Sequence, residues 1–282
     1  MTTEAGGAVG RGVGDEATRR GRRPLARWRP SAAVGAMVLA VLLSQAVAGG
    51  VLLAAGGSRT AMALGLVLAD AVILAVVLLF ARRGAERLTP ATLGIRRTRL
   101  WRAVGWMLAI YVGVIAFEGL WTLLLAIVEG GVHGRRPAGP ALHVGTPVAL
   151  LVLLALAVVA PIAEEVSFRG YLFPALSRWR GPWSAAAVTA LLFGAAHAFV
   201  YPPLLLPLMV AFGFGSCLLF WITGSLLPCV ALHALNNSLV AAIALGWSWQ
   251  VPLAVAGCVA TALAVLAPLA RQRAPQAAAS SG

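Results

Sequence analysis

The sequence predicts an all-α fold, a polytopic helical bundle of about eight spans embedded in a membrane. Three observations support this fold class. Of the 282 residues, 60% are hydrophobic and only 11% are charged. Apolar runs of about 18 residues or more recur along the chain, which is typical of integral membrane proteins. The 22 basic residues, all of them arginine, lie mainly between these runs or in the tails.

Each apolar run of about 20 residues is long enough to cross the hydrocarbon core. Residues 1–30 precede the first run and are rich in Gly, Arg and Thr, so we expect a disordered basic tail. The Ala-Val-Ala sequence at 46–48 resembles a signal-peptide cleavage site, but the apolar run continues past it, which favours a retained span. The runs lie near 33–56, 61–81, 103–128, 147–176, 182–200, 204–222, 228–246 and 248–269; they form a transmembrane bundle over 31–270, followed by a tail over 271–282.

The distribution of arginine predicts the orientation of the bundle. The segment between the second and third runs holds seven arginines, which the positive-inside rule places in the cytoplasm. Alternation then puts both termini in the cytoplasm and leaves only Arg59, Arg135 and Arg136 outside. We therefore expect a multi-pass protein of the plasma (cell) membrane. This topology accounts for the net charge of +13, and the scattered arginines form no basic face for a nucleic acid.

The fourth run differs from the others in length and polarity. Residues 147–178 would make about 48 Å of helix, against a hydrocarbon core of about 30 Å, and Pro174 is expected to kink its end. Its "EEVSFR" sequence carries Glu164, Glu165 and Arg169. A charged side chain at the membrane centre costs roughly 2.5–3.5 kcal/mol on insertion scales, so such residues indicate a functional site.

Two more polar clusters lie in later runs. "FGAAH" carries Phe193 and His197, and "HALNN" carries His233 and Asn237. The two members of the second pair are four residues apart and share one helix face.

The spacing of these residues predicts partners. Glu165 and Arg169 are four apart, with the acid first, so they are expected to pair and leave Glu164 for another group. The "RWRGPW" turn would fold the fourth and fifth runs into an antiparallel hairpin, in which Glu164 lies level with His197.

This set of groups is suited to hydrolysis. A carboxylate can take a proton from water while His197 orients or shares it. His233 and Asn237 can donate hydrogen bonds to the oxygen of a tetrahedral intermediate. The alternative is that the same groups only hold the helices together. Four such groups in register favour the chemical interpretation.

Other polar and sulfur-containing residues in the runs have structural interpretations. Asp70 and Glu118 are expected to make hydrogen bonds between helices. The three cysteines lack the spacing of a metal site, so we expect them to be buried as small apolar side chains.

Together, "EEVSFR", "FGAAH" and "HALNN" resemble the three motifs of the CPBP family, which contains CAAX prenyl proteases and bacteriocin-processing intramembrane proteases and is also called the ABI family. The resemblance covers residues 147–246. It implies an eight-span membrane protease in which Glu164 and His197 activate water, His233 and Asn237 form the oxyanion site, and Glu165, Arg169 and Phe193 support them.

The resemblance does not decide whether a metal ion takes part in the reaction. The family is commonly described as metalloproteases, yet the sequence has no His-Glu-x-x-His helix. Glu164, His197 and His233 could hold a zinc ion or work without one.

We therefore predict an endopeptidase that acts on a membrane-attached protein or peptide, within or near the cytoplasmic leaflet. The arginine-only, alanine-rich composition is typical of a GC-rich bacterial genome, which argues against a literal role on prenylated proteins. One alternative is a non-catalytic scaffold or bacteriocin-immunity protein. Another is a transporter with a carboxylate proton relay, although the two halves show none of the expected internal repeats.

Overall fold

The computed structural model describes residues 28–84, 88–128 and 144–272. Within these ranges every regular element is a helix, so the predicted all-α fold is confirmed, and seven helices are long and apolar enough to span a membrane. The chain runs through α2 (Pro30–Ala54), α3 (Arg59–Arg83), α4 (Leu100–Val128), α5 (Thr146–Leu154), η1 (Ala155–Val159), α6 (Ala160–Glu165), η2 (Val166–Leu172), α7 (Phe173–Ala196), η3 (Pro203–Leu205), α8 (Leu206–Thr223), α9 (Leu226–Ala244) and α10 (Val251–Arg271).

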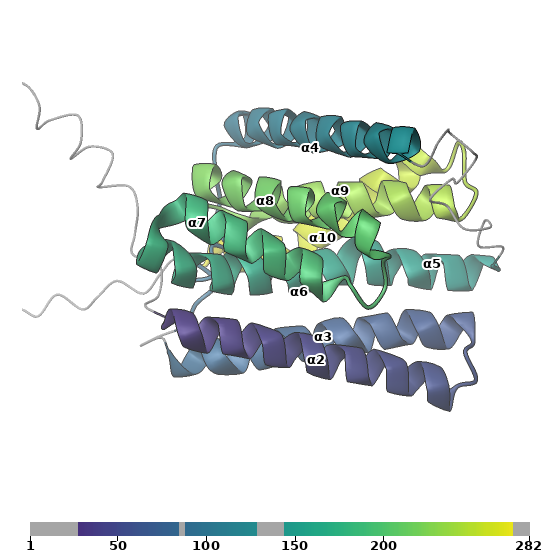
Figure 1. Cartoon of the computed structure of the whole chain (residues 1–282), viewed down its shortest axis with the longest axis horizontal. Helices are drawn as coiled ribbons and strands as arrows, with labels where there is room; N and C mark the ends of the chain where they lie inside the picture. Colours follow the sequence, from purple (N-terminus) through teal and green to yellow (C-terminus); the bar gives the residue numbers. More distant parts are fainter. Residues whose placement is uncertain (1–27, 85–87, 129–143, 273–282) are drawn as a thin grey trace, which may run out of the picture.

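We expected the residues from Thr146 to Ala196 to form two spans, and they form two helical arms within a segment of 51 residues. Gly181 interrupts its helical geometry with φ 80° and ψ 169°, and Pro182 starts the second arm. The two arms pack against each other: the centroids of the Phe168 and Phe193 rings, one from each arm, are 5.1 Å apart. In Figure 1 α7 turns back on itself at this point. The predicted hairpin is therefore present, although its second arm is shorter than a typical span.

Two wide π-helical turns flank the glutamates, and each precedes a proline. The η1 turn ends two residues before Pro161, and the η2 turn ends two residues before Pro174. A proline lacks the N–H that an α-helix needs and crowds the carbonyl four residues earlier. A π turn absorbs this conflict without a sharp kink, and such turns are frequent at functional sites. Pro174 thus widens the helix where we expected it to kink.

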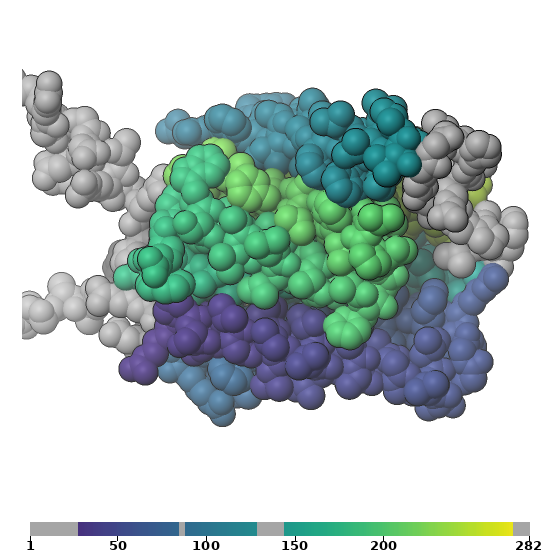
Figure 2. All heavy atoms as spheres, viewed as in Figure 1, coloured from purple at the N-terminus to yellow at the C-terminus, as the bar shows by residue number. Residues whose placement is uncertain are grey.

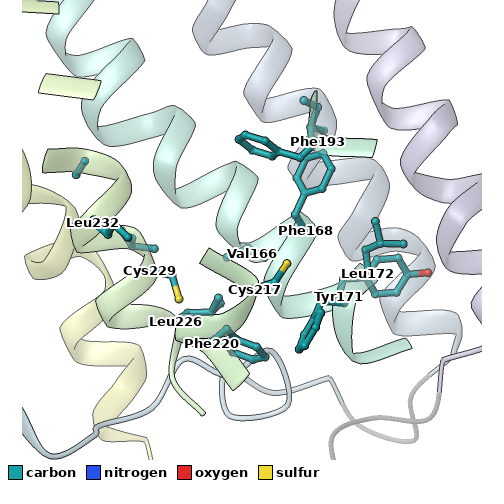
Figure 3. Close-up of a cluster of buried hydrophobic side chains, with 14 of the residues drawn as sticks. Val166, Phe168, Tyr171, Leu172, Phe193, Cys217, Phe220, Leu226, Cys229 and Leu232 are labelled. Atoms are coloured by element: carbon teal, nitrogen blue, oxygen red, sulfur yellow. The ribbon is translucent and has the colours of Figure 1, made fainter. Parts of the chain in front are cut away.

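The helices form layers around the long glutamate-bearing helix (Figure 1). The α2–α3 pair covers one side and α4 the opposite side, with α5 to α10 between them; the space-filling view shows the same order (Figure 2). Figure 3 shows part of the core, in which aromatic and aliphatic side chains from η2, α7, α8 and α9 meet. The three cysteines are buried and free, as predicted.

The arginine-rich end of the bundle is closed by two segments. Trp28 is only 4% exposed; its indole N–H donates to Ala81 O at 3.0 Å, and its ring meets Tyr171 edge-on. The structured part therefore begins earlier than the predicted tail boundary at residue 30, whereas residues 1–27 lie outside the described residues.

The second closing segment precedes α4. Leu226 N donates to Gly94 O at 2.8 Å, and Ser225 Oγ donates to Arg96 O at 2.6 Å. Gly94 has φ 82°, and a Cβ there would lie 2.5 Å from the Phe220 ring, so only glycine fits. This segment also approaches the glutamate-bearing helix: a Cβ on Gly170 would lie 2.9 Å from a backbone oxygen of the segment.

Candidate functional site

The site is built around a buried ion pair on the glutamate-bearing helix. Arg169 Nη1 lies 3.1 Å from Glu165 Oε1, and both side chains are completely buried. The predicted pairing of these two residues is therefore confirmed. The guanidinium also donates to Gly213 O at 3.0 Å and stacks over the Phe193 ring at 4.7 Å. These contacts tie α8 and the second arm of α7 to the helix that carries the glutamates.

His233 reaches both glutamates from α9. Its Nδ1 lies 2.9 Å from Glu165 Oε1, and its Nε2 lies 3.8 Å from Glu164 Oε2. The ring is 3% exposed and packs edge-on against Phe212 with centroids 5.0 Å apart. Spacing along the sequence gave Glu164 a different partner, His197, so this direct contact is new information from the structure.

The hydrogen bonds of His233 define where its protons lie. A carboxylate only accepts, so Nδ1 carries a hydrogen that it donates to Glu165. In a neutral ring Nε2 would then present a lone pair to Glu164, placing two acceptors opposite each other at 3.8 Å. Glu164 Oε2 is buried and has no hydrogen-bond partner among the described residues.

His197 is fixed at the end of α7 by its own helix. Its Nδ1 lies 2.8 Å from Phe193 O, and a carbonyl only accepts, so this nitrogen donates. The neutral ring consequently keeps Nε2 as an acceptor. No hydrogen bond or ion pair within 4.0 Å joins His197 to Glu164, both of which are described. The Phe193 ring connects the two histidines instead, with centroids 4.7 Å from His197 and 6.0 Å from His233.

Asn237 follows His233 by one helical turn and donates from Nδ2 to Leu156 O at 2.8 Å. Its Oδ1 accepts from Asn236 Nδ2 at 3.4 Å, and Asn236 Oδ1 accepts from the Tyr111 hydroxyl on α4 at 3.4 Å. One N–H of the Asn237 amide is thus used on the backbone, and its second N–H is available for another acceptor.

Three contacts of the site were missing from the sequence analysis. Phe212 packs on His233, and Gly213 supplies the carbonyl for Arg169. The "AFGFG" sequence of α8 gave one signal for the second contact, because glycine in an apolar helix often marks a close approach of two backbones. A Cβ on Gly213 would lie 3.2 Å from Ala190 Cα.

Tyr201 is the third missed residue. Its main-chain N–H donates to His197 O at 2.9 Å, and the two rings lie 6.0 Å apart. Burial, and then the nearby charge of Glu164, raise the pKa of the Tyr201 phenol above its ordinary value. The hydroxyl therefore stays a hydrogen-bond donor near the carboxylate.

Asp70 approaches the same carboxylate from α3. It is 6% exposed and close enough to Glu164 for the two carboxyl groups to interact electrostatically. The hydrogen bond between helices that we expected for Asp70 stays a prediction.

The side chains fit a metal ion poorly in this arrangement. Among the described residues, no group of three or more His, Cys, Asp or Glu side chains is placed to hold one. His233 and His197 use Nδ1 on Glu165 and on a backbone carbonyl, which leaves each Nε2 available as metal-ligating histidines require, but these nitrogens and Glu164 do not form a group placed around one ion. A zinc site needs at least three protein ligands converging at about 2.0–2.3 Å.

Comparison with known proteins supports the motif assignment. Residues 146–239 match the family model described as type II CAAX prenyl endopeptidase Rce1-like. No curated protein and no solved structure matches the chain. The matched segment begins with α5 and ends within α9, so it contains both glutamates, both site histidines, Arg169 and Asn237. Over this segment, about a third of its length, the chain is similar to the Rce1-like type II CAAX prenyl endopeptidases, which supports the resemblance carried by the three motifs.

Proposed function

We propose that the protein is an intramembrane endopeptidase that hydrolyses a peptide bond of a membrane-attached protein or peptide. The observation that carries the proposal is the buried Oε2 of Glu164, which accepts no hydrogen bond among the described residues and lies 3.8 Å from His233 Nε2, inside a segment similar to a peptidase family. A side-chain carboxylate in an apolar span is costly, and one whose oxygen is not used for packing is well placed to act on a substrate.

In this proposal Glu164 is the general base. It accepts a proton from water, whose oxygen attacks the carbonyl carbon of the scissile bond. His197 orients the water through its free Nε2. The C–N bond then breaks, and the amine leaves with the proton held by Glu164. The products are a carboxylic acid and an amine.

His233 and Asn237 would stabilise the oxyanion. When His233 is protonated, Nδ1–H bonds to Glu165 and Nε2–H faces Glu164 and the reacting carbonyl. The second N–H of Asn237 supplies another donor. Donors already fixed in a dry site are effective, because removal of one such donor typically costs about 10²–10³ in kcat. No step in this mechanism passes through a metal ion.

Replacing Glu164 by glutamine tests the proposal. Glu164→Gln keeps the size and polarity of the side chain but removes the base, so turnover should fall by about 10²–10⁴ while the protein level stays normal. We would reconstitute both proteins in liposomes with a farnesylated CAAX peptide and its unprenylated counterpart. In parallel, the termini of membrane proteins would be compared between cells that carry either form.

A non-catalytic scaffold makes the opposite forecast. The contacts of Arg169 and His233 join three helices to the glutamate-bearing helix, which is the observation that favours this alternative. If Glu164→Gln retains full biological activity at normal abundance, the scaffold is correct and the peptidase proposal is wrong.

A further inference from the structure

Pro161 interrupts the main-chain hydrogen bonds just before the glutamates. The N–H of Ala160 donates to Ala155 O, five residues earlier, and so bypasses the Leu156 carbonyl. The next donor in this i→i+5 pattern would be residue 161, which has no N–H because it is proline. The Leu156 carbonyl is therefore left without a donor from its own helix.

The side chain of Asn237 supplies the missing donor. Its Nδ2 lies 2.8 Å from Leu156 O, although the two residues are 81 positions apart in the chain. Water is scarce inside a bilayer, so a carbonyl released by proline must find a partner in a neighbouring helix. Asparagine fits this task because a planar amide can donate while its oxygen accepts from elsewhere.

The same contact sets the position of His233. Both residues lie on α9, one turn apart, and the helix is attached to the glutamate-bearing helix at two points: Asn237 on Leu156 O and His233 on Glu165. Two attachments along one helix fix its depth and its rotation. A small rotation of α9 would open the 3.8 Å approach between His233 Nε2 and Glu164 Oε2.

We propose that Asn237 is a positioning residue: its amide replaces the N–H that Pro161 lacks, and this bond holds His233 against the two glutamates. The inference rests on the proposed function only in that Glu164 and His233 are among its reacting groups. It adds a residue, Pro161, that no motif includes, and it makes the proline and the asparagine a dependent pair.

If Asn237 is needed only because Pro161 lacks an N–H, a substitution of Pro161 should compensate for loss of the Asn237 amide. Asn237→Leu keeps a similar volume but removes the amide, so α9 should lose one attachment. Pro161→Ala adds an N–H in line to continue the i→i+5 pattern to Leu156 O, so in that background the amide should be dispensable. Pro174→Ala is the matched control: it removes another proline of the same segment, which follows the second π turn, but gives no donor to Leu156.

The readout is the ring of His233 in the full-length protein, labelled with ¹⁵N-histidine in lipid nanodiscs and assigned with a His233→Gln variant. We expect Asn237→Leu to shift the His233 ring resonances by more than a linewidth. Pro161→Ala with Asn237→Leu should return them to the parent positions, and Pro174→Ala with Asn237→Leu should not. If Asn237→Leu fails to accumulate, the amount of folded protein recovered by each proline variant is the measure, with the same order expected.

Three results would overturn the inference: unchanged His233 resonances in Asn237→Leu, no recovery with Pro161→Ala, or equal recovery with Pro174→Ala. The resonances are recorded without turnover, so this test is independent of the test of peptidase activity. Rescue by Pro161→Ala in a protein that cleaves nothing would keep the positioning role and reject the function.

Discussion

At the scale of single residues, Arg169 is expected to be important for stability because it joins Glu165 to α8. Its guanidinium is fully buried and bonds to both Glu165 and Gly213 O. Arg169→Ala would leave Glu165 without its permanent cation, and breaking a buried pair costs about 3–5 kcal/mol. We expect Arg169→Ala to lower unfolding stability in detergent by that order, whereas Glu164→Gln stays near the parent. Arg169→Lys should fall between, because lysine keeps the charge but not the forked geometry. Equal stability of Arg169→Ala and parent would contradict the importance of the pair.

Metal removal tests the same site from another direction. No three metal-binding side chains converge among the described residues. Hydrolysis by the reconstituted protein should therefore persist after dialysis against a strong chelator. The comparison needs a known zinc peptidase treated in parallel, which should lose activity. Loss of turnover that added zinc restores would show that Glu164, His197 and His233 rearrange around a metal ion.

At the scale of elements, close helix packing depends on Gly213. A Cβ there would lie 3.2 Å from Ala190 Cα and from the Phe193 ring, so Gly213→Ala should push α8 away from α7 and strain the bond from Arg169. Overpacking of this kind typically costs about 1–3 kcal/mol. Gly113→Ala on α4 is the control, because nothing lies within 4 Å of its Cβ; helix propensity alone should make that change neutral or slightly stabilising. Thermal unfolding in detergent measures both.

Local spacing made part of the site predictable. Glu165 and Arg169 pair because residues four apart meet on any helix, and the hairpin follows from a Gly-Pro turn between two apolar runs. The contact of His233 with Glu165 joins residues 68 positions apart. Such a contact depends on which helices pack together and on how each is rotated about its axis. A hydropathy pattern predicts neither. The burial of Trp28 was not predicted for a related reason: it depends on contacts with Tyr171 and Ala81, which are distant in the sequence, whereas the residues next to Trp28 are polar.

At the scale of the whole molecule, the arginines of the described residues lie mainly at one end of the bundle. The ends of α3 and α8 and the starts of α4 and α9 meet at the end that carries the arginines (Figure 1), and Arg59 is the one described arginine placed at the opposite end. The closing segments at the arginine-rich end are held by the Trp28 indole N–H on Ala81 O and by bonds from Leu226 N and Ser225 Oγ to the segment before α4. The positive-inside rule predicts that this end, with both closing segments, faces the cytoplasm.

Cysteine labelling can decide this orientation in intact cells. The native cysteines Cys217, Cys229 and Cys258 are buried, so background labelling should be low. Thr60→Cys places an exposed thiol at the start of α3, and Arg97→Cys places one in the segment before α4. The positive-inside rule predicts that a membrane-impermeant maleimide labels Thr60→Cys in intact cells and labels Arg97→Cys only after permeabilisation. The permeabilised sample also controls for reactivity, since both thiols should then react. Labelling of Arg97→Cys alone in intact cells would invert the bundle, and the closed end would then face outward.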